Sequence, residues 1–492
     1  MIRRLFLAVV VLLVLGCARV HQPDVLTGTL PRIWPDYTHL VLPCNIAPLN
    51  FIVREAGSRC QVEVGTHGQV SFAVTSPDSI VRLPEAPWQE LLAAATNDTV
   101  FVRVSVERDG LWHQYSDIRH YVSPFPIDPV LSYRLLYPGY EFWNEMGIYQ
   151  RDLTGFGETC LLENRRTGGQ CMNCHSFAAK SPETLMLHVR GKNGGTLLLK
   201  DGKISKVQPK PAGHSRSATY PYWSDDGRHI VFSSNEVNQG FHTAGPQMIE
   251  VYDKASDLFV YEVESGTSFT DSLVYGDDYL ETFPTFTPDG RQIYFCRARR
   301  SSPGLPVDSV RYGLYRVDFD AVRHTFSGLE CVIDAPAHQR SISFPRVSPD
   351  GRWLVYTQSA YGTFSIWHPE SDLWLLDLQT GRCRSLDEVN SPHVDSYHSW
   401  SSDGHWLVFS SKREDGLWAR PYICFFHPAT GEAGKPFLLP QRDPDHYNRC
   451  TFTYNLPELV KGTVKDERRL ERMLEQLQPH GREPSASRND IP

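Results

Sequence analysis

Short runs of alternating apolar and polar residues recur along most of the chain, and turn residues separate one run from the next. A period of two places the apolar side chains on one face of a strand, and runs this short are typical of strands. The upstream runs predict a β-sandwich-like domain over residues 30–125, interrupted by one helix at residues 87–95. The runs lie at residues 39–42, 51–53, 61–64 and 99–104.

Four segments in the C-terminal two-thirds of the chain share a longer pattern. Each has an aromatic or proline lead-in, then Ser or Thr, then a turn that ends in Asp-Gly, then an apolar strand. Asp-Gly supplies the positive backbone angles of a tight hairpin, and the strand after it is apolar enough to be buried between sheets. The four pairs are Asp226-Gly227, Asp289-Gly290, Asp350-Gly351 and Asp403-Gly404.

One such repeat is a four-stranded sheet that cannot bury both faces alone, so the repeats predict radial stacking in a β-propeller. Their signature resembles that of TolB-like propellers, which implies the same fold. We therefore expect an all-β chain, in which the N-terminal β-sandwich-like domain is followed by a five- or six-bladed β-propeller over residues 181–460. Residues 184–207 are candidates for a further blade, and residues 450–454 for ring closure or a blade edge.

The first seventeen residues predict export. Arg3 and Arg4 precede an apolar run at residues 5–15, which is too short to span a bilayer, and Gly16 stands before Cys17. This resembles a bacterial lipoprotein signal peptide, which implies cleavage before Cys17 and attachment of lipid to it. We expect a lipoprotein of the bacterial cell envelope that faces the periplasm or the cell surface. An ordinary signal peptide or an N-terminal membrane anchor are the alternatives.

Two further segments complete the expected organisation. Residues 126–180 predict a linker with a haem attachment segment, because residues 124–129 are rich in proline and lack periodicity. Residues 461–492 predict a charged amphipathic helix followed by a disordered tail.

The stretch CMNCH places Cys171, Cys174 and His175 in the order that covalent haem attachment requires. In c-type attachment two thiols bind the haem vinyl groups and the adjacent histidine is the proximal iron ligand. A thioredoxin-like dithiol would need a βαβ context, and a zinc site would need a second pair of ligands nearby; neither is found. Chance occurrence with buried thiols is the remaining alternative. We predict one covalent haem c per chain, because the motif occurs once.

The sixth iron ligand is left open by the sequence. His188 and Met186 lie two residues apart on an expected strand, so their side chains share a face. A thioether ligand would raise the reduction potential relative to a second imidazole, and a missing ligand would leave an open site. The candidates are His188, His242 and Met186, followed by His214 and Met146.

Charge and cysteine content narrow the function further. The formal net charge of −8 argues against a nucleic-acid partner, which needs an excess of Lys and Arg. Eight cysteines remain besides Cys17, Cys171 and Cys174, and this even number permits disulfides after export. Cys44 with Cys60 is the best local pairing. No Gly-x-Ser-x-Gly elbow occurs, so the chain lacks a hydrolase signature.

The chain also resembles haem-motif, TolB-like propeller lipoproteins of Bacteroidetes, which implies this fold and haem but no established activity. We expect an exported, lipid-anchored mono-haem cytochrome c that transfers electrons to an envelope redox partner. The alternative is a propeller scaffold that binds another envelope protein, with the haem structural or absent. If the chain is an enzyme, we expect a haem-dependent oxidoreductase. The resemblance is carried by residues 45–51, 138–141, 146–151, 171–177, 250–253 and 256–258.

Overall fold

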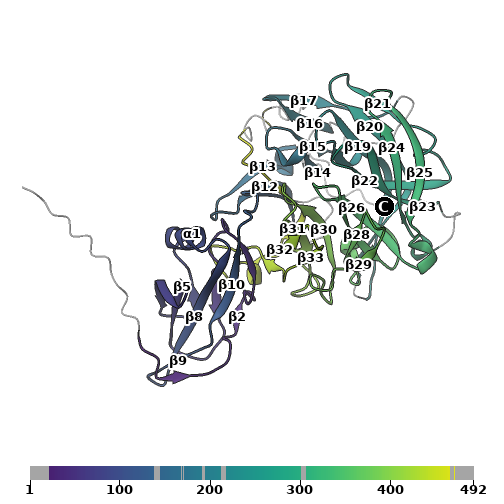
Figure 1. The fold of residues 1–492 in the computed structure, drawn as a ribbon. Coiled ribbons are helices and arrows are strands. Elements are labelled where there is room, and N and C mark those ends of the chain that lie inside the picture. Colours follow the sequence, from purple (N-terminus) through teal and green to yellow (C-terminus); the bar gives the residue numbers. More distant parts are fainter. Residues whose placement is uncertain are drawn as a thin grey trace, which may run out of the picture.

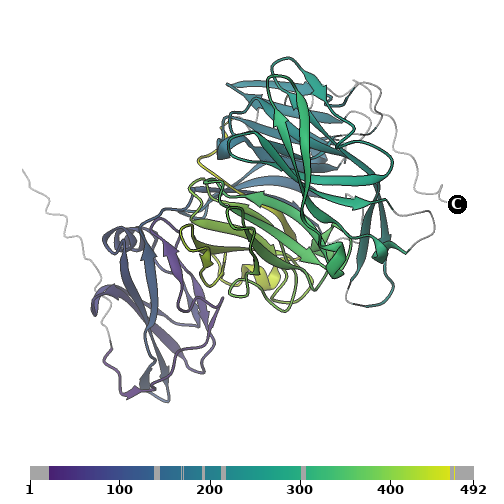
Figure 2. The same cartoon turned by 45° about the vertical axis from the view of Figure 1, so that its right-hand side comes forward.

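Strands form two units in the computed structural model, an N-terminal β domain and a β-propeller beside it (Figure 1; Figure 2). The model describes residues 21–137, 145–167, 169, 171–190, 194–211, 216, 218–245, 247–300, 306–465, 470 and 472. Within these residues no helix is long and apolar enough to cross a membrane. The expected signal at residues 1–17 with Cys17, and most of the expected helix and tail at residues 461–492, lie outside them.

The N-terminal domain places two sheets on one core. The larger, seven-stranded sheet has the order β1-β9-β8-β10-β3, with β5 joining β8 to β6, and the smaller sheet has the order β2-β4-β7. Helix α1 (Glu85–Ala94) buries Trp88 against this core, close to where the sequence predicts a helix. The strands are β1 Val25–Leu26, β2 Ile33–Trp34, β3 Val41–Pro43, β4 Phe51–Val53, β5 Arg59–Thr66, β6 Gln69–Ser76, β7 Ile80–Val81, β8 Asp98–Arg108, β9 Leu111–Gln114 and β10 Ile118–Ser123.

In the part of the chain that the structure describes, the propeller has six blades, each a sheet of at least four antiparallel strands. The all-β prediction and the upper of the two expected blade numbers are thus confirmed. Blades 1 to 3 contain β35 Thr453–Val460, β11 Val130–Leu136, β12 Met146–Asp152 and β13 Glu158–Glu163; β14 Met172–Phe177, β15 Leu185–Val189, β16 Gly195–Lys200 and β17 Lys203–Val207; and β18 Thr219–Trp223, β19 His229–Phe241, β20 Ile249–Glu262 and β21 Thr267–Phe269.

Blades 4 to 6 follow in chain order and carry the last three Asp-Gly repeats. A short strand, β34 (Phe437–Leu438), adds to β32 of blade 6, and helix α2 (His446–Arg449) leads toward β35. The strands are β22 Tyr279–Phe286, β23 Gln292–Arg299, β24 Gly313–Asp320 and β25 Thr325–Ile333; β26 Ser341–Val347, β27 Trp353–Ser359, β28 Asp372–Asp377 and β29 Cys383–Ser385; and β30 Asp395–Trp400, β31 Trp406–Ser411, β32 Arg420–His427 and β33 Glu432–Ala433.

Blade 1 closes the ring with strands from both ends of the propeller. β35 pairs antiparallel with β11, so residues 453–460 complete a sheet that begins at residue 130. The expected linker over residues 126–180 is therefore wrong, because most of that segment forms blade 1 and the innermost strand of blade 2. Residues 184–207, expected as material for a further blade, form β15 to β17 of blade 2, and the expected ring closure near residues 450–454 is made by β35. The strands at residues 130–177 were not predicted as blade strands, because the repeated Asp-Gly signature is missing between the two innermost strands of blades 1 and 2.

Side chains of the turn itself hold each of the four repeated Asp-Gly turns. In blade 5 the Ser348 hydroxyl donates to Asp350 at 2.5 Å, while the Trp353 amide donates to Ser348 and the Arg352 amide to Asp350. Gly351 adopts φ +73, which a residue with a Cβ atom adopts at a cost. The same bonds recur around Asp226, Asp289 and Asp403.

The two units share one hydrophobic core rather than meeting at a thin interface. Buried side chains of the N-terminal domain, such as Val104, belong to the same cluster as Leu407 of blade 6 and Leu459 of β35. The Tyr37 hydroxyl donates to the Leu438 carbonyl at 3.1 Å across this junction. The N-terminal domain therefore lies against the part of the ring where blades 6 and 1 meet (Figure 1).

The described cysteines are free thiols. Cys60 is buried and its Sγ donates to the Asp78 carbonyl at 3.3 Å, so the expected Cys44–Cys60 disulfide is wrong. The two cysteines are close in sequence but not in the sheet, because Cys44 directly follows β3 and Cys60 lies on β5, and β10 and β8 stand between these two strands.

Candidate functional site

Cys174 and His175 lie on β14, the innermost strand of blade 2, and Cys171 comes directly before it. All three residues are buried. Cys174 pairs across the sheet with His188, and His175 with Leu187, in antiparallel register, and the register shifts between Met172 and Cys174.

Successive residues on a strand point to opposite faces of the sheet. The His175 ring lies 6.2 Å from that of Phe177, on the face toward Glu458 of blade 1. The Cys174 thiol lies on the opposite face, toward the backbone of Tyr220 in blade 3. In c-type attachment the second cysteine and the histidine must both face the same haem. Because β14 is extended, Cys174 and His175 point to opposite faces of the sheet and do not meet this requirement. Haem c stays a prediction, and its attachment would require residues 171–175 to leave the strand.

The structure gives Cys174 and His175 a place in the propeller repeat. The Ala178 amide donates to the Thr184 carbonyl just as the Ser401 amide donates to that of Trp406 in blade 6. Counting back from this shared bond, Cys174-His175-Ser176-Phe177 is equivalent to residues 397–400, whose sequence is Tyr-His-Ser-Trp. Two of the three residues of the haem motif thus belong to the lead-in of a blade that has no Asp-Gly turn between its two innermost strands.

The structure does not bring the candidate sixth ligands together opposite His175. His188 and Met186 share the Cys174 face of the sheet, because they pair across it with Cys174 and Ser176. The Nδ1 atom of His188 lies 3.0 Å from the Thr196 hydroxyl, and Met186 is fully buried between blades 2 and 3.

The remaining candidates have other surroundings. The Nε2 atom of His242 lies 3.4 Å from Glu250 on the β19–β20 hairpin. The Met146 sulfur accepts a hydrogen bond from the Met172 amide. His214 lies outside the described residues.

Burial controls the protonation of the motif. It raises the pKa of both the Cys171 and the Cys174 thiols, an effect that Arg134 and Arg190 oppose. It also lowers the pKa of His175 to about 4 and that of His188 to about 3. The thiols are therefore protonated and the imidazoles neutral at pH 7. Neither ring nitrogen of His175 has a hydrogen-bond partner among the described residues.

A collar of apolar side chains narrows the central channel of the propeller. Five innermost strands each contribute one residue with φ near +50. The Phe283 ring packs 4.4 Å from Tyr220 and 4.0 Å from Phe344, whose ring lies 4.5 Å from Tyr397. The five residues are Tyr220, Phe283, Phe344, Tyr397 and Leu456. A side chain forced into the left-handed region is strained, and strain of this kind concentrates at functional sites.

On one side of the collar lies a small polar cavity of about 50 Å³. His175 lines it together with Arg346 and with Lys180, whose ammonium group lies 3.2 Å from Glu458. The cavity is far too small for a haem or any other large ligand.

On the other side lies the channel mouth, a cavity of about 490 Å³. Its walls are mainly apolar, with Met146, Ile249 and Trp367 among them. Three cations also line it, Arg134, Arg190 and Lys412, together with one carboxylate, that of Glu145. Lys412 is 7% exposed, and its ammonium group lies 4.5 Å from the centre of the Trp367 ring. Apolar walls with a few convergent charges are typical of a ligand site.

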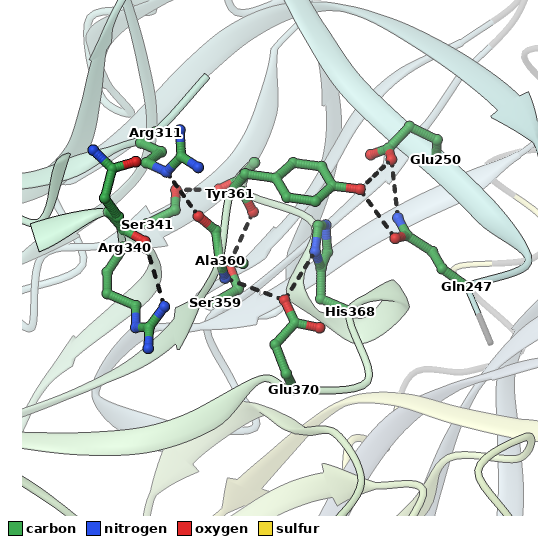
Figure 3. A network of polar contacts seen from close by, with 12 residues as sticks. Gln247, Glu250, Arg311, Arg340, Ser341, Ser359, Ala360, Tyr361, His368 and Glu370 are labelled. Atoms are coloured by element: carbon green, nitrogen blue, oxygen red, sulfur yellow. Dashed lines mark hydrogen bonds and ion pairs between the residues drawn. The ribbon is translucent and has the colours of Figure 1, made fainter. Parts of the chain in front are cut away.

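The β19–β20 hairpin forms one wall of the channel mouth and is fixed in place by blade 5. The Tyr361 hydroxyl lies 3.0 Å from the Gln247 side chain and donates to Glu250 at 2.8 Å. Figure 3 shows this tyrosine reaching from its loop toward both residues of the hairpin, with His368 packed beside it. The shape of the cavity therefore depends on contacts between two separate blades.

These features define the class: an all-β protein in which an N-terminal β domain joins a six-bladed propeller. No family model matches the chain, so its resemblance to haem-motif, TolB-like lipoproteins stays a prediction. Dipeptidyl-peptidase 5 of Porphyromonas gingivalis is 22% identical over 173 residues, which are 35% of this chain. The matched region is 21% of that peptidase, so its activity does not transfer to this chain as a finding.

Two solved structures are similar at a greater distance. Oligogalacturonate lyase in complex with manganese is 17% identical, with a TM-score of 0.36 over 63% of this chain and 79% of the lyase chain. The β-propeller domain of the Trilobed protease from Pyrococcus furiosus is 12% identical, with a TM-score of 0.35 over 62% of this chain and 81% of that one. Likenesses this distant carry no functional conclusion.

Proposed function

We propose that this protein is a propeller-based binding protein of the bacterial cell envelope, tethered by lipid on Cys17. In this proposal its channel mouth binds an organic anion with a large apolar body. The observation that carries the proposal is a cavity with mainly apolar walls in which three cations, the buried Lys412 and the half-buried Arg134 and Arg190, outnumber a single carboxylate, Glu145.

The volume and the charge of the channel mouth both favour a small organic anion. A cavity of about 490 Å³ lies within the range of small-molecule sites, roughly 300–1,000 Å³. The Arg190 Nε atom is buried and has no hydrogen-bond partner among the described residues. Buried cations are costly unless an anion accompanies them, so a ligand with an acidic group would relieve the cost that Arg190 and Lys412 impose.

The fluorescent sulfonate 1-anilinonaphthalene-8-sulfonate is a suitable probe because it combines aromatic rings with one negative charge. We expect saturable binding to the folded chain, and an affinity at least tenfold lower in the double variant Arg190→Gln, Lys412→Met. A loss of this size corresponds to about 1.5–3 kcal/mol for a charge-assisted hydrogen bond. Arg32→Gln is the matched control, since Arg32 is 74% exposed in the N-terminal domain. Equal affinity in the double variant and the wild type would contradict the proposal.

Covalent haem c with an electron-transfer role is a second candidate. Haem is itself an apolar body with two carboxylates, and when bound it would supply one-electron transfer. Arg134 and Arg190 line the channel mouth and also lie close enough to the Cys171 and Cys174 thiols to act on their pKa values. Cys171, Cys174 and His175 would hold the group after the strand rearrangement described above.

Expression with haem-attachment machinery, followed by a pyridine haemochrome spectrum and an intact mass, tests this candidate. One covalent haem in the wild type, absent from Cys171→Ala, Cys174→Ala, would support it. The exposed pair Cys331→Ala, Cys383→Ala is the control and should leave haem content unchanged. Absence of haem, under conditions that load a reference cytochrome, would rule it out and leave the anion-binding proposal standing.

A further inference from the structure

Two histidines and a glutamate gather at the junction of blades 3 and 4, apart from the channel. His229 is the first residue of β19 and Glu262 the last residue of β20, and the two are direct partners across the sheet. His324 comes from the turn between β24 and β25 of the next blade. Three residues far apart in sequence thus meet at one point between two sheets.

The three ligand atoms converge without bonding to one another. The Glu262 Oε1 atom lies 3.9 Å from His229 Nε2 and 3.7 Å from His324 Nε2, and all three atoms lie within 4.8 Å of one another. Both separations from Glu262 are too long for a hydrogen bond. Neither Nε2 atom has a hydrogen-bond partner among the described residues, and the His229 side chain is only 3% exposed.

In blade 4 the position equivalent to His229 is occupied by Gln292, and its contacts differ. Gln292 and Asp318 of blade 4 are also cross-strand partners, and Gln292 follows its Asp-Gly turn just as His229 follows Asp226-Gly227. There the Gln292 amide donates directly to Asp318 at 2.9 Å. His229 and Glu262 instead leave a gap, and His324 faces that gap.

Neighbouring groups hold the three ligands in orientation. The Ser265 hydroxyl donates to Glu262 Oε2 at 2.6 Å, which leaves Oε1 directed at the histidines. The His324 ring stacks on Phe269 with centroids 3.8 Å apart, and the His229 ring meets the edge of Phe319.

The donor set and its spacing match a metal ion of the zinc class. Zinc binds histidine nitrogen and carboxylate oxygen at about 2.0–2.2 Å, so two ligands of one ion stand about 3.3–3.5 Å apart in a tetrahedron. The observed 3.7 and 3.9 Å approach this after a shift of a few tenths of an ångström. Imidazole with carboxylate favours zinc and similar divalent ions over calcium or magnesium.

We propose that His229, Glu262 and His324 bind one zinc-class divalent ion that joins blade 3 to blade 4. Water would occupy the fourth position, because His324 and Glu262 remain partly exposed, with side chains 24% and 17% accessible. The site is separate from the channel mouth, so the metal-binding proposal does not depend on the anion-binding proposal.

Cobalt(II) is the best probe, because its visible spectrum reports the ligands. We expect the full chain, stripped with a chelator, to bind one equivalent of Co²⁺ with a four-coordinate d–d spectrum, which Zn²⁺ then displaces. Absence of thiolate-to-metal charge-transfer absorption would show that the ion is not held by cysteine. A spectrum dominated by such absorption, or no uptake at all, would overturn the proposal.

Two variants locate the ion without disturbing the fold. Glu262→Gln keeps shape, and His324→Asn suits the left-handed φ of +55 at that turn. We expect at least tenfold weaker Co²⁺ binding in each, with wild-type affinity in the control His338→Ala, an exposed histidine in the connection between blades 4 and 5. Saturating zinc should raise the melting temperature of the wild type and of the control but not of the two variants. Unchanged affinity in His324→Asn would refute the site.

Discussion

At the residue scale, Lys412 is the cation in the channel mouth whose charge depends most on pH. Burial lowers its pKa to about 8, against a smaller opposing effect of Asp415. A bound anion favours the ammonium form, so the ligand and the proton support each other at this site. Lys412 is thus mostly charged at pH 7, about half charged near pH 8 and increasingly neutral at higher pH.

Anion binding should therefore weaken as the pH rises through 8. We expect the affinity for 1-anilinonaphthalene-8-sulfonate to be constant from pH 6 to 7 and to fall by up to tenfold per pH unit above 8. The sulfonate does not titrate in this range. Lys412→Arg keeps its charge throughout and should remove the fall. A flat wild-type profile would show that Lys412 does not contact the anion.

Cys171, Cys174 and His175 show what the sequence can and cannot predict about a residue. The order of these side chains indicates haem chemistry, yet order along the chain says nothing about secondary structure at that point. The pairing of β14 with β15 sends Cys174 and His175 to opposite faces. Aligning Cys174-His175-Ser176-Phe177 with the Tyr-His-Ser-Trp segment of blade 6 would have revealed the strand from sequence alone.

At the element scale, the repeats with Asp-Gly turns were predictable because every bond of the turn lies within six residues. Blade 5 shows this, since Ser348, Asp350 and Gly351 make the turn by themselves. In blade 1 only the closing strand was anticipated, near residues 450–454, because no repeated Asp-Gly turn marks β11 to β13 and β11 pairs with β35 from the far end of the propeller. The metal-ligand cluster was missed for the same reason, since only the packing of two blades brings His324 to Glu262.

Removal of the Asp350 carboxylate tests how much one Asp-Gly turn contributes to the free energy of unfolding. Asp350→Ala removes the acceptor of the Ser348 hydroxyl and of the Arg352 amide. We expect it to lower the free energy of unfolding by about 1–3 kcal/mol, measured from urea denaturation midpoints. Asp387→Ala, at an exposed position, should leave the midpoint unchanged. Equal midpoints for the two variants would mean that the glycine alone determines the turn.

At the scale of the whole molecule, the N-terminal domain and the propeller are coupled by a common core. The Asn50 side-chain amide donates to the Gln441 carbonyl, and the Arg151 guanidinium donates to that of Pro440. Together with the Tyr37–Leu438 bond, these contacts tie both units to the segment between blade 6 and the closing strand. A chain that looks like two domains in sequence is expected to unfold as one.

Leu459→Ala tests that coupling, because Leu459 is fully buried on β35, where ring closure and the shared core coincide. The cavity should cost about 2–5 kcal/mol. If the core is common, hydrogen exchange should accelerate by a similar factor in β8 of the N-terminal domain and in β31 of blade 6. Leu111→Ala, 46% exposed on β9, should alter neither strand. Wild-type protection of β8 alongside a loss in β31 would instead mean that the N-terminal domain keeps its own stability when the ring opens.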